Sequence, residues 1–201
     1  TLSYRGKQLL RHFDVDLGRN LLSEMQKQGV EVMLSNNVES LEKNADSVKV
    51  NFKEQSSQIY DAVLYATGRA PATDEIGLNN TDVELRPNGE VIVDEYFQTR
   101  ESSVFALGDI IGTPELTPVA IEQGMAFADT WYKNKRRKVD YDAIPTAVFS
   151  HPNIGTVGLS EQQARERYSD VEIYESEFRH LKHTLSGNTE RTYMKLVLSL
   201  I

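Results

Sequence analysis

The sequence of 201 residues contains no cysteine, and this absence limits the chemistry open to the chain. Without thiols it can form no disulfide framework, no thiolate zinc site and no cysteine nucleophile of its own. Aromatic residues make up only 8%, and no apolar run approaches the roughly 20 residues that a membrane-spanning helix needs. What is there, 39% apolar and 26% charged residues, is typical of a soluble globular protein.

Positive charge is also scarce, since the sequence has 22 basic and 30 acidic residues and therefore a net charge of −8. An acidic chain gains no bulk attraction to nucleic acid or to an anionic membrane, so we expect neither as a partner. The basic run Lys133–Lys138 is interpreted as a solvated loop. The sequence starts at Thr1 without an initiator Met or a signal-peptide pattern, and it stops at Ile201 within an apolar run. We therefore expect a piece of a longer protein.

Hydrophobic periodicity predicts an α/β fold. A helix is expected over residues 14–28, with Asp14 as N-cap and Gly29 after its end, and a strand follows at Val30–Leu34. A helix that leads into a buried strand indicates a βαβ unit. Three short antiparallel strands are expected between Val38 and Ala66, and the run Ala62–Tyr65 belongs to the last of them.

The rest of the chain predicts fewer regular elements. Residues 68–103 read as mostly irregular, because prolines and an Asn-Gly pair interrupt them. The expected elements are strands at Val91–Val93, Val104–Leu107, Val171–Phe178 and Tyr193–Ile201, and a helix from Pro118 with Thr117 as N-cap.

The first candidate site is Asp109, which follows the buried run Val104–Leu107 directly after Gly108. A carboxylate at the carboxyl end of a strand lies where open α/β sheets bind ligands, and it can accept hydrogen bonds from sugar or ribityl hydroxyls. The helix that begins near Pro118 offers unpaired N–H groups to an anion or an electron-rich ring. On local pattern alone, a Gly-Asp turn beside an ordinary proline-started helix is the simpler interpretation.

A resemblance shifts that balance. The segments Val104–Asp109 and Leu116–Ile121 resemble the second FAD-binding motif of the glutathione reductase family, a class of FAD- and NADPH-dependent pyridine nucleotide-disulfide oxidoreductases. Tyr65–Arg69, Ile144–Pro152 and Ile154–Leu159 are similar to the same family in the same order. The resemblance implies that Asp109 binds the flavin ribityl chain and that Leu116 and Thr117 face the flavin ring.

Arg5 and Arg11 form the second candidate site. Guanidinium groups recognise phosphate through paired hydrogen bonds, and an arginine near the second Rossmann strand meets the 2′-phosphate of NADP. The stretch from Tyr4 to Asp14 is similar to the NADP loop of the family, which implies that Arg5 and Arg11 hold this phosphate. The alternative is two surface cations in a loop. By the same resemblance, Gly68, Glu115 and the backbone of Ala147 approach the nicotinamide.

Met125 departs from the family pattern. Some members carry an arginine at this position that pairs with a glutathione carboxylate, which a methionine cannot do. The substrate-binding residues therefore stay open, and Arg179 or Lys182 is a candidate to supply the positive charge instead. His180 and His183 are three residues apart but lack a suitably spaced third ligand, so we expect no metal site.

The resemblance implies an α/β fold with parts of two Rossmann-like domains, followed by the start of an α+β interface domain. Residues 1–70 would complete the NADP domain, residues 71–143 contact FAD, and residues 144–201 open the dimerisation domain. The chain lacks the cysteine pair and the acid/base histidine segment of the family, so it contains no catalytic residue and should be inactive alone. The expected parent is a cytoplasmic homodimer that reduces glutathione disulfide through FAD and NADPH. Alternatives are another disulfide reductase, a soluble transhydrogenase, or a non-catalytic cofactor-binding or assembly module.

Overall fold

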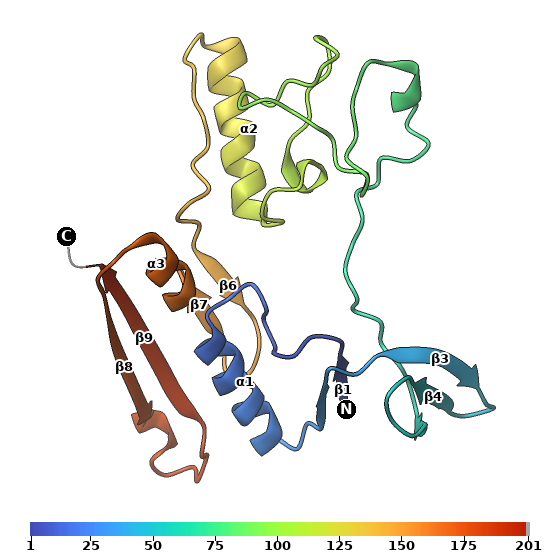
Figure 1. Ribbon diagram of the computed structural model, residues 1–201, viewed down its shortest axis with the longest axis vertical. Coiled ribbons are helices and arrows are strands. Elements are labelled where there is room, and N and C mark those ends of the chain that lie inside the picture. Colours follow the sequence, from blue (N-terminus) through green and yellow to red (C-terminus); the bar gives the residue numbers. More distant parts are fainter. Residues whose placement is uncertain (200–201) are drawn as a thin grey trace. The chain divides into compact units, whose positions relative to one another are not determined.

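The computed structural model describes residues 1–199, and the chain divides into two compact units. Unit 1 combines residues 1–64 with the chain from residue 145 onward, and unit 2 consists of residues 65–144. Figure 1 labels their helices and strands. Unit 1 is therefore assembled from the two ends of the sequence.

The N-terminal part of unit 1 is a small βαβ unit followed by three antiparallel strands. Its elements are β1 (Leu2–Tyr4), α1 (Val15–Lys27), β2 (Val32–Leu34), β3 (Val38–Lys43), β4 (Val48–Phe52) and β5 (Gln58–Tyr60). Strand β1 pairs in parallel with β2, and β4 lies between β3 and β5 in an antiparallel sheet. The predicted βαβ unit and three-strand sheet are confirmed.

The sequence signals at the ends of α1 act as predicted. The Asp14 side chain accepts a hydrogen bond from the Asp16 N–H at 3.0 Å and so caps the first turn. The helix ends at Lys27, and Gly29 follows with a φ of 83°, a conformation that glycine adopts without strain. The amphipathic face of the helix packs Leu21 against Leu9 and Ile154, which forms one core of unit 1.

The C-terminal part of unit 1 contains two antiparallel strand pairs and a short helix. Its elements are β6 (Thr146–Val148), β7 (Ile154–Thr156), α3 (Glu161–Arg167), β8 (Val171–Arg179), a 3₁₀ turn (Leu181–His183) and β9 (Arg191–Ser199). Strands β8 and β9 pair without interruption from Val171↔Ser199 to Arg179↔Arg191. The two predicted strands are confirmed, except that the last two residues of Tyr193–Ile201 lie outside the described part.

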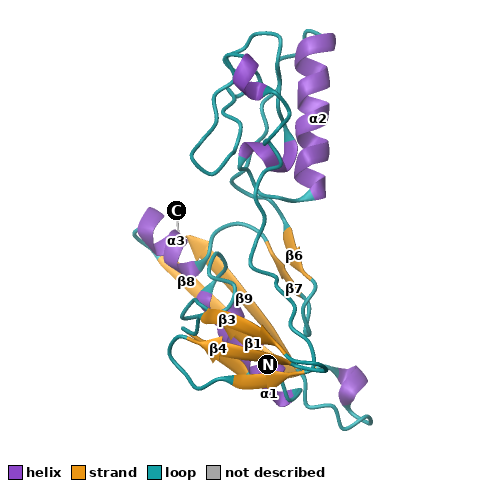
Figure 2. Ribbon diagram, turned by 90° about the vertical axis from the view of Figure 1, so that its right-hand side faces the viewer, coloured by secondary structure: helices purple, strands orange, loops and turns teal. Residues whose placement is uncertain are grey.

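Unit 2 is mostly loop. It contains α2 (Thr117–Tyr132) and two 3₁₀ turns, Leu78–Asn80 and Gly108–Ile111. Figure 2 shows how few regular elements interrupt this part of the chain. Its core joins Val91, Phe97 and Ala106 to Ile111 and to Ala126 of α2.

Two predicted strands and part of a third are wrong. The run Ala62–Tyr65 forms no strand, and Leu64 is 90% exposed. Val91 makes a single bridge to Leu85, and Phe105 a single bridge to Gln98, so neither 91–93 nor 104–107 is a strand. A strand requires a partner along its whole length, and the described residues give these apolar runs at most one bridge each.

The start of α2 differs from the prediction by one residue. The N-cap is Leu116, and Thr117 is the first helical residue with Pro118 after it. The Thr117 side chain makes no capping bond, because proline sets the first turn through its fixed φ instead.

Candidate functional site

Arg5 and Arg11 lie in the loop between β1 and α1. Leu9, at the middle of this loop, is 7% exposed and packs against Leu21 and Ile154. Its carbonyl runs so close to α1 that a Cβ at Gly18 would lie 2.4 Å from the Leu9 oxygen. The loop is therefore anchored at its centre while both arginines remain exposed.

A tight turn presents Arg11 beyond that anchor. Leu10 has a φ of 53°, and the Phe13 N–H donates to the Leu10 carbonyl at 2.8 Å. The Arg11 Nε donates to His12 at 2.9 Å, and among residues 1–199 neither Arg5 nor Arg11 has an ion-pair partner. Two exposed guanidinium groups without a carboxylate partner suit a phosphate, so the loop fits an anionic cofactor.

An ion cluster around the buried Lys195 side chain holds the end of this loop. The Asp14 carboxylate accepts bonds from the Asp16 N–H at 3.0 Å, from the Glu161 N–H at 2.9 Å and from the Lys195 ammonium at 3.0 Å. Burial alone would raise the pKa of Asp14, but the two backbone N–H groups and Lys195 together hold that pKa below its usual value. One side chain thus ties the starts of α1 and α3 to β9.

Asp109 lies in the 3₁₀ turn of unit 2. Its Oδ2 accepts a hydrogen bond from the Arg69 guanidinium at 2.9 Å, and the two side chains are 38% and 71% exposed. Gly108 before it has a φ of 80°, which a residue with a Cβ adopts only under strain. The carboxylate is accessible and still has free lone pairs for hydroxyl donors.

The side chain that holds this turn in place is Gln123 of α2, which is fully buried. Its Oε1 accepts from the Gly108 N–H at 2.6 Å, while its Nε2 donates to the hydroxyls of Thr113 and Tyr141 at 2.9 Å each. Sequence reasoning missed this residue. A polar residue between Val119 and Ala126 on the inner face of a helix was the available signal.

The first turn of α2 is open to solvent. Glu115 and Thr117 are exposed, Leu116 is half-buried, and no side chain caps the helix. Since Pro118 has no N–H and the Thr117 N–H has no partner within the described part of unit 2, the positive end of the helix dipole is free. This end suits an anion or a ring that gains negative charge.

The structure places the remaining predicted residues on accessible surface. Gly68 has a φ of 126° and open space around it, since a methyl group added there would meet nothing within 4 Å, and Met125 is 47% exposed on α2. Ala147 is exposed at the centre of β6, opposite Gly155.

Within unit 2 the structure joins Asp109 to Arg69, the residue after Gly68. Arg5, Arg11 and Ala147 belong to unit 1.

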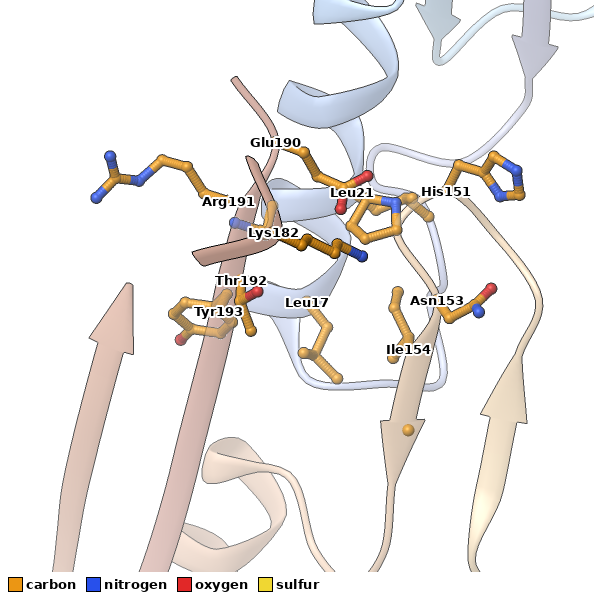
Figure 3. A pocket seen from close by; sticks show the side chains of 13 residues that line it. Leu17, Leu21, His151, Asn153, Ile154, Lys182, Glu190, Arg191, Thr192 and Tyr193 are labelled. Atoms are coloured by element: carbon orange, nitrogen blue, oxygen red, sulfur yellow. The ribbon is translucent and has the colours of Figure 1, made fainter. Parts of the chain in front are cut away.

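A pocket of about 420 Å³ lies elsewhere in unit 1, between α1, the 151–155 turn and the segment 182–193. Figure 3 shows Lys182 extending across it, whereas Arg191 points away and pairs with Glu177 at 2.6 Å. None of the predicted cofactor residues lines this pocket. It is therefore separate from both candidate cofactor sites.

Comparison with known families gives two matches. Residues 1–124 match pyridine nucleotide-disulphide oxidoreductases, and residues 144–200 match the dimerisation domain of the same oxidoreductases. Among residues 1–199, no helix is both long and apolar enough to cross a membrane.

Individual relatives include two glutathione reductases. The protein from Burkholderia cepacia is 43% identical, and the match covers 98% of this chain and 44% of that protein. The chloroplastic/mitochondrial protein from Pisum sativum is 39% identical, and the match covers 97% of this chain and 36% of that protein. Trypanothione reductase from Trypanosoma congolense is 37% identical over 99% of this chain and 41% of that protein. The chain thus spans less than half the length of the curated relatives it matches.

Among solved structures, the HOCl-induced flavoprotein disulfide reductase RclA from Escherichia coli is similar with a TM-score of 0.88 and 25% identity. The match covers 98% of this chain and 45% of that one. The predicted fold class, an α/β flavoprotein segment followed by part of a dimerisation domain, is confirmed by the family and structure matches together.

Proposed function

This chain belongs to the pyridine nucleotide-disulphide oxidoreductase family, and on that premise we propose that it is part of an NADPH-dependent flavoprotein that reduces glutathione disulfide. The observation that carries the proposal is 43% identity to a glutathione reductase over 98% of the chain. The exposed Arg5 and Arg11, which form no ion pair within residues 1–199, add to it, because NAD-linked Rossmann domains keep an acid where NADP-linked ones place an arginine.

We propose that Arg5 and Arg11 bind the 2′-phosphate of NADPH. Their loop fits this group, since its centre is anchored at Leu9 and its cations have no ion-pair partner within residues 1–199. Gly68, Glu115 and Ala147 are proposed to approach the nicotinamide, and all three are exposed.

Asp109, Leu116 and Thr117 are proposed to hold FAD. The half-exposed Asp109 carboxylate suits ribityl hydroxyls, and the uncapped start of α2 suits the electron-rich side of the ring. Bound FAD would supply two-electron transfer between NADPH and a disulfide. Within this chain, Arg69 orients the Asp109 carboxylate and Gln123 holds the Gly108 N–H, so both preorganise the site.

The proposed parent protein supplies what the 201 residues lack, namely the redox cysteine pair and the acid/base histidine. The apolar surface of both units supports a larger assembly. Large apolar side chains lie in it, including Leu64, Phe149 and Leu185.

We propose a cytoplasmic homodimer with three segments: residues 1–70 from the NADP domain, 71–143 contacting FAD and 144–201 from the dimerisation domain. The match of residues 144–200 to a dimerisation domain supports the dimer. Met125 offers no charge to a glutathione carboxylate, which favours a related disulfide as the second candidate substrate.

The test is NADPH oxidation by the full-length, flavin-loaded protein with glutathione disulfide, with NADH as the control reductant. Rapid oxidation of NADPH and slow oxidation of NADH supports the proposal. Oxidation that starts only when another disulfide replaces glutathione disulfide selects the second candidate, and no oxidation with any disulfide refutes the reductase assignment.

A further inference from the structure

Lys195 is the most enclosed of the ion-paired cations in the described part of unit 1, although no part of the proposed cofactor chemistry uses it. Its side chain is 4% exposed, and its ammonium lies 2.6 Å from Asp16, 2.7 Å from Glu161 and 3.0 Å from Asp14. Glu175 lies further away, at 3.8 Å. Burial alone would lower the pKa of Lys195, but the hydrogen bonds that its ammonium donates to Asp16, Glu161 and Asp14 raise it above its usual value, so the lysine stays charged.

The three close carboxylates come from different parts of the fold. Asp14 and Asp16 lie at the start of α1, in the segment that matches the oxidoreductase family, while Lys195 on β9 and Glu161 on α3 lie in the segment that matches the dimerisation domain. Carboxylate oxygens of Asp16, Glu161 and Glu175 lie within 4.8 Å of one another, which is close enough to bind one cation together. The ammonium of Lys195 lies beside all three carboxylates. Lys195 therefore acts as the central cation that joins both segments within unit 1.

This cluster fixes one end of the turn that carries Arg11. The turn runs from the buried Leu9 to Asp14. Only two residues separate Arg11 from Asp14, whose carboxylate pairs with Lys195. With Leu9 and Asp14 both held, the backbone at Arg11 has little freedom. If Lys195 is lost, Asp14 and Asp16 remain as neighbouring carboxylates that repel each other, which loosens the Asp14 end of the turn.

We propose that Lys195 is a positioning residue for NADP recognition: from the dimerisation segment, it holds Asp14 and thereby keeps Arg11 in place for the cofactor 2′-phosphate. The inference rests on the proposed role of Arg5 and Arg11. If Lys195 positions Arg11, its loss weakens the binding of NADP, which carries the 2′-phosphate. The binding of NAD, which lacks this phosphate, stays almost unaffected.

The test measures binding of NADP⁺ and NAD⁺ by calorimetry to the full-length, flavin-loaded protein and its variants. Lys195→Met is expected to raise the Kd for NADP⁺ about tenfold, the worth of one weakened charge-assisted hydrogen bond, and to change the Kd for NAD⁺ less than about twofold. Lys195→Arg keeps the charge and should restore most of the NADP⁺ affinity. Lys49→Met removes an exposed pair with Glu42 in the same unit and is the matched control, with both affinities unchanged.

The affinities of the wild-type protein test the proposed phosphate site independently of the role of Lys195. Wild type that binds NADP⁺ no better than NAD⁺ refutes the proposed phosphate site, and the inference falls with it. Wild type that prefers NADP⁺ while Lys195→Met keeps the same preference refutes the inference alone. If Lys195→Met does not fold, Asp14→Asn decides the question, because asparagine still caps the helix but loses the charge that Lys195 holds. An unchanged ratio of the two Kd values in that variant overturns the proposal.

Discussion

Replacing Gln123 with leucine removes three hydrogen bonds and puts an apolar side chain in their place. The bonds join the Gly108 N–H, the Thr113 hydroxyl and the Tyr141 hydroxyl to a side chain that is fully buried. Each neutral bond contributes about 1 kcal/mol net, and the Gly108 N–H would stay behind without an acceptor. We expect Gln123→Leu to lower the free energy of unfolding of unit 2 by roughly 3 kcal/mol.

The assay is urea unfolding of wild type and variant, followed by far-UV circular dichroism for both units and by the fluorescence of Trp131, the single tryptophan, which lies on α2, for unit 2. A stability loss without a change in the urea dependence would show that the native state and not the unfolded chain is affected. Gln162→Leu, at an exposed position of α3, is the matched control and should shift stability by less than about 0.5 kcal/mol. Equal effects of the two substitutions would refute the role given to Gln123.

Two further predictions follow from single contacts. Gly18→Ala should destabilise unit 1 by about 2 kcal/mol in the same unfolding assay, since its methyl group would lie 2.4 Å from the Leu9 carbonyl, whereas Gly124→Ala, with nothing within 4 Å, should be neutral or stabilising. Asp109→Asn should weaken flavin retention by the full-length protein roughly tenfold, measured as flavin absorbance after gel filtration, and leave the unfolding midpoint unchanged, because the exposed pair with Arg69 is worth less than about 1 kcal/mol. A glycine pair that behaves alike, or an Asp109 variant that keeps its flavin, would contradict these assignments.

The sequence predicted the elements whose signals are local. Asp14 and Gly29 delimit α1 because capping depends on a few neighbouring residues, and the alternating strands β8 and β9 pair across one connection. The strand expected at Val104–Leu107 is wrong for the opposite reason: an apolar run becomes a strand only when another strand lies beside it.

The residues that hold the candidate sites were beyond the reach of the sequence. Alternation in β9 suggests Met194, Leu196 and Leu198 as the inward side chains, yet these are exposed and Lys195 faces inward. Two of the partners of Lys195, Asp14 and Asp16, lie 181 and 179 residues away in the chain, a separation at which single-sequence patterns carry no information. The arginines and Asp109 were found because they belong to recognisable motifs, and their roles in cofactor binding stay predictions.

The assembly of unit 1 from both ends of the sequence has a consequence for the order of events during synthesis. A ribosome releases residues 65–144 before it has made β9, so unit 2 can form its core while α1 still lacks the lysine that neutralises its first turn. Closing a loop of that length costs only slightly more entropy than closing a shorter one, so the delay arises from translation and not from the energy of the final state. Until that moment residues 1–64 lack the C-terminal strands that complete unit 1, so their fold depends on chain that is made later.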